Sequence, residues 1–102
     1  MGYLLTGRHM SAMRAYELGL INEVVPRADL DECVQGWVED IPRCAPLAIR
    51  ATKQAAMMGL DTSLAEAFEQ SYPAEIARAN SSDALEGPKA FAEKRSPQWQ
   101  GK

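Results

Sequence analysis

The residues from Ser82 to Arg95 restrict the possible folds of this chain more than any other stretch. Asp83 precedes Glu86 by three residues, which is typical of a reciprocal cap at a helix start and makes a catalytic role for either carboxylate unnecessary. Gly87-Pro88 predicts an interruption, because proline removes a backbone donor. From Ala90 to Arg95 the segment resumes an apolar stripe and ends in basic residues. It therefore predicts an amphipathic helix with a cationic tip.

Proline and glycine divide the rest of the chain into helix-sized segments. Apolar residues at helical spacing predict helices over 12–18, 30–41, 46–58 and 63–76, with a kink or break at Pro73. Gly7 marks Tyr3–Leu5 as the last turn of a further helix. Only 21–25 favours a strand, because it is β-prone and precedes Pro26. The expected fold is mainly α, with about five helices and at most one short strand.

Polar residues mark where three of these helices begin. Ser11 is a suitable N-cap, and Asp29 can cap the helix that follows it. Glu32 follows Asp29 by three residues, and Glu66 follows Ser63 in the same way, so both pairs predict capping boxes.

Composition excludes several classes of function. Eleven basic and fourteen acidic residues give a net charge of −3, which argues against general nucleic-acid binding. No apolar run is long enough to cross a bilayer, and the first residues do not resemble a signal peptide, so we expect a cytoplasmic protein. Cys33 and Cys44 are expected to be buried free thiols. With His9 as the only histidine, no metal site is expected.

The last segment resembles the final helix of the crotonase superfamily, the enoyl-CoA hydratase/isomerase proteins, with the pattern D-x-x-E-G-x-x-A-F-x-E-K-R. The matching residues are Asp83, Glu86, Gly87, Ala90, Phe91, Glu93, Lys94 and Arg95. Earlier parts of the chain resemble the same superfamily more weakly, and the matching segments occur in the superfamily's order. They are Leu5-Thr6-Gly7-Arg8, Ser11-Ala12 with Ala15, Gly19-Leu20, Asn22-Glu23-Val24-Val25-Pro26, and Ala45-Pro46-Leu47-Ala48 with Lys53. Together they cover almost the whole chain.

The resemblance implies that residues 1–102 are a single C-terminal helical domain, the trimerisation region of a crotonase-like fold. The superfamily's oxyanion hole and catalytic glutamates belong to an N-terminal ββα-spiral region that precedes the Leu-Thr-Gly turn and is absent here. No residue of this chain matches a catalytic motif, so no catalytic residue is expected and the chain alone is expected to be inactive.

Lys94 and Phe91 are the two candidate binding residues that the resemblance implies. In that superfamily the matching lysine reaches across a subunit interface towards the phosphates or adenine of coenzyme A (CoA). An ammonium suits phosphate, although a solvated lysine is the alternative. Phe91, three residues earlier, is either a core or interface anchor or an apolar wall beside the adenine.

The resemblance leaves the reaction open. The whole enzyme is expected to hydrate a 2-enoyl-CoA reversibly to a 3-hydroxyacyl-CoA, as a homo-oligomer (a trimer or a dimer of trimers) acting on acyl-CoA. An enoyl-CoA isomerase and a carnitinyl-CoA-type dehydratase are alternatives. Since separate helices carry apolar stripes, a non-catalytic helical oligomerisation module is another.

Overall fold

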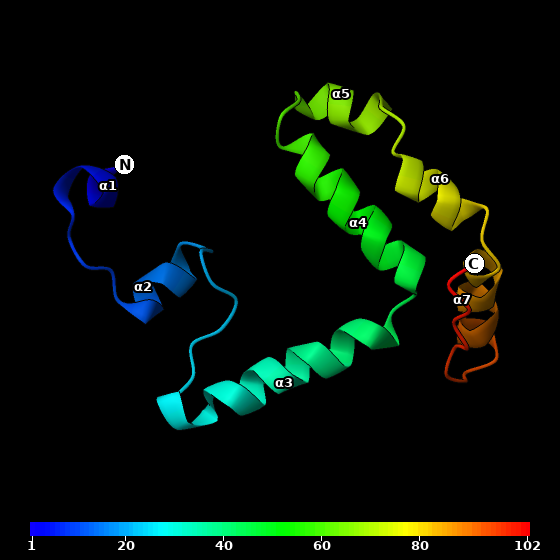
Figure 1. Cartoon of the computed structure of the whole chain (residues 1–102), viewed down its shortest axis with the longest axis horizontal. Coiled ribbons are helices and arrows are strands. Elements are labelled where there is room, and N and C mark those ends of the chain that lie inside the picture. The colour runs from blue at the N-terminus through cyan, green and yellow to red at the C-terminus, as the bar shows by residue number, and fades with distance from the viewer. The chain divides into compact units, whose positions relative to one another are not determined.

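The computed structural model describes all of residues 1–102 as helices joined by loops, with no strand. The chain divides into two compact units, Met1–Gly36 and Trp37–Lys102. Figure 1 shows the α-helices. They are α1 (Gly2–Thr6), α2 (Ala12–Glu17), α3 (Leu30–Asp40), α4 (Pro46–Gly59), α5 (Leu64–Glu69), α6 (Pro73–Ala79) and α7 (Asp83–Ala92), with 3₁₀ turns η1 (Arg27–Asp29) and η2 (Ile41–Arg43). The mainly α prediction is confirmed.

The residues predicted to bound the short helices of the first unit do so, although α2 ends one residue earlier than predicted. α1 ends at Gly7, which takes the left-handed conformation with φ 63°. The side chain of Ser11 caps α2 by accepting a 3.1 Å hydrogen bond from the backbone N–H of Arg14. Gly19 follows α2 with φ 72°.

Two predictions for the first unit are wrong. Residues 21–25 form no strand, since the chain offers no second strand to complete a ladder. Asp29 does not act as an N-cap, because η1 leads directly into α3 and places Asp29 inside continuous helical backbone.

In the second unit, α4 packs mainly along α6 and also contacts α5, while α6 contacts α7. α5 begins with the predicted capping box, in which Ser63 and Glu66 each accept a hydrogen bond from the other's backbone N–H. Pro73 separates α5 from α6, which confirms the predicted break. It stands at the first position of α6, where a helix needs no N–H.

Side-chain hydrogen bonds fix the junction between α4, α5 and α6. Gln54 on α4 accepts a 2.8 Å hydrogen bond from the backbone N–H of Ala74, one of the donors that the start of α6 leaves without a helical partner. The hydroxyl of Tyr72 donates to the carbonyl of Ala67 at 2.8 Å and accepts from Gln70 at 2.6 Å.

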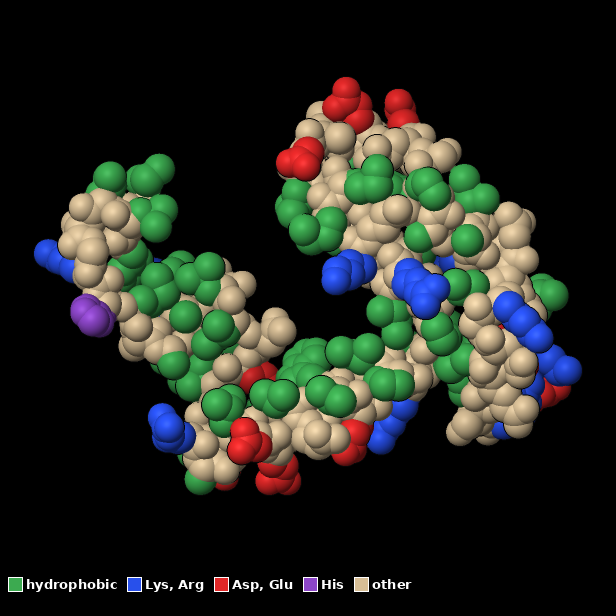
Figure 2. All heavy atoms as spheres, viewed as in Figure 1, with side chains coloured by type: hydrophobic (Ala, Val, Ile, Leu, Met, Phe, Trp, Pro, Cys, Tyr) green, Lys and Arg blue, Asp and Glu red, His purple; other side chains and the backbone are tan.

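The chain buries few of its own apolar side chains. Ala51, at 3% exposure, and Ala90, at 1%, are its only buried hydrophobic residues. Apolar side chains gather along α3, as Figure 2 shows. No helix is both long and apolar enough to span a bilayer.

Neither cysteine is buried, which corrects that prediction. Both are free thiols; Cys33 is half-buried and Cys44 is exposed. The Sγ of Cys33 donates to Glu23 Oε2 at 3.3 Å, and this bond raises the pKa of the Cys33 thiol.

Candidate functional site: helix α7 and the returning chain end

Helix α7 runs from Asp83 to Ala92 without interruption, so the predicted break at Gly87-Pro88 is wrong. Pro88 removes one donor inside the helix but does not end it. The indole of Trp99 lies against Gly87 and supports α7 at this point. The helix also ends earlier than the predicted Arg95, because the backbone turns left-handed at Lys94.

A Schellman turn closes the end of α7. The N–H of Lys94 donates to the carbonyl of Phe91 at 3.2 Å, and the N–H of Arg95 donates to that of Ala90 at 3.0 Å. Lys94 has φ 53° and is the only non-glycine residue of the chain with a positive φ. Glycine is the usual residue at this position, so the backbone preference disfavours a lysine there.

Arg95 is held by two carboxylates beside this turn. Its Nη1 and Nη2 lie 2.6 and 3.0 Å from the two carboxylate oxygens of Glu86, and its Nε lies 2.6 Å from Glu93 Oε2. This fork geometry is the strongest form of an arginine–carboxylate pair. The hydrogen bonds to Arg95, followed by one from the backbone N–H of Gln98, lower the pKa of Glu86 to about 2. Those to Glu86 and Glu93 raise the pKa of Arg95 above its ordinary value.

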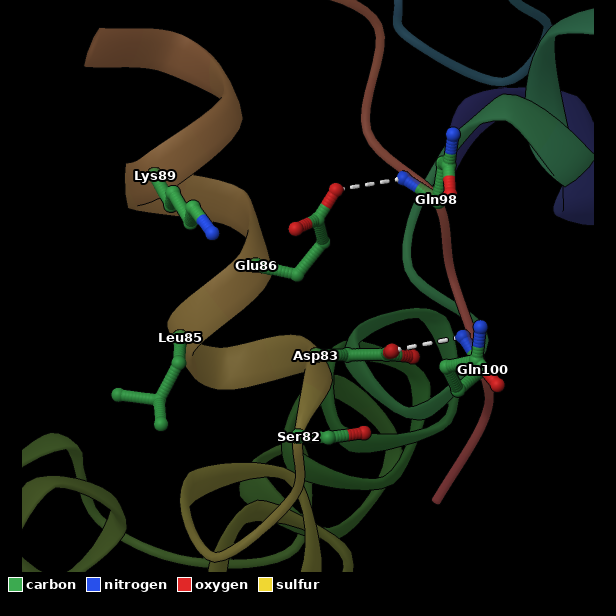
Figure 3. A pocket seen from close by; sticks show the side chains of 7 residues that line it. All are labelled: Ser82, Asp83, Leu85, Glu86, Lys89, Gln98 and Gln100. Atoms are coloured by element: carbon green, nitrogen blue, oxygen red, sulfur yellow. Dashed lines mark hydrogen bonds between the residues drawn. The ribbon is translucent and has the colours of Figure 1, made fainter. Parts of the chain in front are cut away.

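The carboxylates of Asp83 and Glu86 bind the returning chain end rather than capping each other, which corrects the sequence-based prediction. Asp83, at 4% exposure, accepts from the backbone N–H groups of Gln100 and Gly101 at 2.7 and 2.9 Å. Glu86 accepts from that of Gln98 at 2.8 Å. Figure 3 shows Asp83 and Glu86 pointing from α7 towards this segment. The N-cap residue of α7, Ser82, makes no side-chain capping bond, but the hydroxyl of Ser81 before it accepts from the N–H of Ala84 at 3.2 Å.

An open pocket of about 290 Å³ lies between α7 and the returning chain (Figure 3). Its lining combines one apolar side chain with polar and charged groups: Ser82, Asp83, Leu85, Glu86, Lys89, Gln98 and Gln100. Both of its carboxylates already bind protein donors. Through these bonds both carboxylates hold the returning chain against α7.

Lys94 and Phe91 lie outside this pocket, at the end of α7. Phe91 is 87% exposed and does not belong to the core of this chain. Lys94 is exposed as well. The structure thus leaves an aromatic ring and a cation exposed three residues apart at the end of α7.

Comparison with known proteins identifies the chain. All of residues 1–102 match the sequence model of a family described as enoyl-CoA hydratase/isomerase. The chain belongs to the enoyl-CoA hydratase/isomerase family. Its curated relatives include carnitinyl-CoA dehydratases of Proteus mirabilis, 38% identical over 97% of this chain, and of Salmonella typhi, 37% identical over 97%. Each match spans 40% of the relative.

Solved structures of the enoyl-CoA hydratase/isomerase family agree with the fold. An enoyl-CoA hydratase/isomerase from Mycobacterium paratuberculosis superimposes with a TM-score of 0.87 at 41% identity, over 95% of this chain and 38% of that protein. A putative short chain enoyl-CoA hydratase from Novosphingobium aromaticivorans gives 0.86 at 38% identity, over 96% and 39%. The chain therefore spans about 40% of the length of these relatives and corresponds to their C-terminal portion.

Sequence reasoning missed the contacts that shape this end of the family fold. The partners of Asp83 and Glu86 lie 12 to 18 positions further along the chain. The one available signal is Trp99, a large aromatic residue close to the chain end, whose indole N–H donates to the carbonyl of Arg43 at 2.7 Å.

Proposed function

We propose that this chain is the C-terminal helical part of an enoyl-CoA hydratase-like enzyme, where it joins subunits and supplies Lys94 and Phe91 to the CoA site. The whole enzyme would hydrate 2-enoyl-CoA reversibly to 3-hydroxyacyl-CoA as a cytoplasmic homo-oligomer. Residues 1–102 act in it as a single domain, and the chain alone is inactive.

The exposed end of α7 is the observation that carries this proposal. A phenylalanine at 87% exposure is unfavourable in water, so a binding partner that covers Phe91 gains apolar contact. Lys94 adds a flexible point charge suited to phosphate. An exposed aromatic ring three residues from an exposed cation fits the nucleotide end of CoA, which combines an adenine with phosphates.

The apolar faces support the subunit-joining role. Leu30, Val34 and Val38 on α3 are each about half exposed. A chain that leaves such faces uncovered gains by association with other copies or other parts of the enzyme.

Two other reactions fit the same family. The first curated relatives are named carnitinyl-CoA dehydratases at 36–38% identity, which favours a dehydratase as the second candidate. An enoyl-CoA isomerase is the third, since the family description includes isomerases. A helical module that only oligomerises is the alternative of a different class.

Sedimentation velocity of the chain, over a range of protein concentrations and with and without CoA, tests the proposal. We expect association that increases with concentration and a CoA-dependent shift that Lys94→Ala removes. Lys53→Ala, which deletes an exposed lysine on α4, is the matched control and keeps the shift. Association that ignores CoA in every variant supports the oligomerisation module. Hydration of crotonyl-CoA by the purified chain would contradict its proposed inactivity.

A further inference from the structure

The left-handed turn at Lys94 needs an explanation beyond the helix end itself. A residue with a Cβ populates this conformation about five- to thirtyfold less readily than the right-handed one. The chain places a long cationic side chain where glycine would fit without strain. Backbone strain of this kind persists when the surroundings hold it in place.

Arg95 restrains the backbone beside Lys94 in this way. Its backbone N–H completes the Schellman turn with Ala90, and its guanidinium bonds to Glu86, nine residues earlier on α7. The residue after Lys94 is thus fixed to the body of the helix at two independent points. A third bond, from Nε to Glu93, fixes the residue before Lys94 as well.

The ion pairs occupy the guanidinium of Arg95 and leave the ammonium of Lys94 available to bind an anion. Arg95 is engaged by two carboxylates and lies at 35% side-chain exposure, whereas no ion pair involves Lys94. Lys94 therefore projects between two residues that are both restrained, while its own ammonium stays free for an anion.

We infer that Arg95, through its fork to Glu86, is a positioning residue that holds residue 94 left-handed and so fixes where the Lys94 ammonium meets the phosphates of CoA. The binding half of this inference rests on the proposed function. The conformational half does not, because it concerns the backbone of the free chain.

The conformational half is tested by NMR on the isotope-labelled chain without ligand. The three-bond HN–Hα coupling and the Cα and Cβ shifts of Lys94 report its φ. We expect the positive φ in the wild type and a loss of it in Arg95→Ala. Arg95→Lys, which keeps the charge but cannot form the fork, is expected to lose most of it too. Retention of the positive φ in both variants overturns the inference.

Arg78→Ala is the matched control. Arg78 forms the same kind of fork with Glu75 on α6, at 2.7 and 2.5 Å, and has the same 35% side-chain exposure as Arg95. Its removal changes the charge equally but leaves residue 94 untouched. An equal change of φ at Lys94 in Arg78→Ala would show a general loss of structure and overturn the assignment to Arg95.

Calorimetric titration with CoA tests the binding half. If only about one molecule in six keeps the left-handed turn, the apparent affinity falls about sixfold in Arg95→Ala. In a Lys94→Ala background, Arg95→Ala should cause no further loss, because the side chain it positions is gone. Additive losses overturn a role through Lys94. Unchanged affinity in Lys94→Ala instead refutes the proposed CoA contact, and the φ measurement still decides the conformational claim.

Discussion

The indole N–H of Trp99 donates to the backbone carbonyl of Arg43 at 2.7 Å, across 56 positions of sequence. The same ring lies against Gly87 on α7, where a Cβ would lie 3.4 Å from the nearest ring carbon. One side chain thus ties η2 to the last helix within the second unit. The chain end is fixed by this contact and by the carboxylates of Asp83 and Glu86.

Removing the indole N–H of Trp99 should lower the stability of the chain end. Trp99→Phe keeps an aromatic ring but loses the bond to Arg43, and we expect the free energy of unfolding to fall by about 1 kcal/mol. Trp99→Ala should cost more, because it also removes the packing against Gly87. Urea denaturation measures the loss, and faster hydrogen exchange at the amides of Gln100 and Gly101 locates it. Gln98→Ala, which keeps the backbone donor to Glu86, serves as the control; equal stability of Trp99→Phe and the wild type would refute the role of the bond.

Substitutions at Gly87 test the packing of the Trp99 indole against α7. A glycine inside a helix is less favourable than alanine by about 0.5–1 kcal/mol, and an added Cβ at 3.4 Å from the indole makes an ordinary contact. We therefore expect Gly87→Ala to stabilise the chain by up to about 1 kcal/mol. Gly87→Val should destabilise it, because the branched side chain displaces the ring. Thermal unfolding of the two variants checks the signs, and destabilisation by alanine would contradict this description of the contact.

Local signals predicted most of the helix boundaries for which the partners lie within one turn, with Asp29 as the exception because η1 leads directly into α3. Ser11, the Ser63–Glu66 pair and Pro73 act on neighbours three or four residues away, so the sequence alone contains both partners of each interaction. The family resemblance of the last segment is of the same kind, because it depends on the spacing of residues along one helix.

The errors arise where distant partners compete with local ones. Asp83 and Glu86 have the spacing of a reciprocal cap, yet backbone donors 12 to 18 positions away occupy their oxygens. The break expected at Gly87-Pro88 fails for a related reason: the indole of Trp99 packs against the helix there. At 21–25 the error arises because a distant partner is missing: this β-prone run has no second strand to pair with. Sequence spacing cannot reveal such partners.

Lys94→Gly should change stability and CoA binding in opposite directions. Lys94→Gly relieves the left-handed strain, and we expect it to raise the free energy of unfolding by about 0.5–1 kcal/mol. Lys94→Ala keeps the Cβ and should leave stability nearly unchanged, which makes it the control for loss of the ammonium. Both should weaken CoA binding. Thermal unfolding with parallel CoA titration gives both quantities, and a less stable Lys94→Gly chain would show that residue 94 carries no strain.

Acid should destabilise the end of α7 through Glu86. Its pKa is about 2 in the folded chain, against an ordinary value of 4.5 when unfolded. Between these values the unfolded chain binds a proton that the folded chain does not, so stability rises with pH. The contribution is fully present above about pH 4.5 and is lost as the pH falls towards 2.

Glu86→Gln isolates this contribution, because the amide cannot ionise. Urea midpoints measured from pH 5 to pH 2 should fall less steeply for Glu86→Gln than for the wild type. Some slope should remain, since hydrogen bonds from Ser63 and Arg78 lower the pKa of Glu66 and Glu75 in the same direction. Added salt should reduce the difference, because the Glu86–Arg95 pair is partly exposed and ions screen it. Identical slopes for the two proteins would mean that the fork to Arg95 does not form in solution, and the positioning of Lys94 would then lose its support.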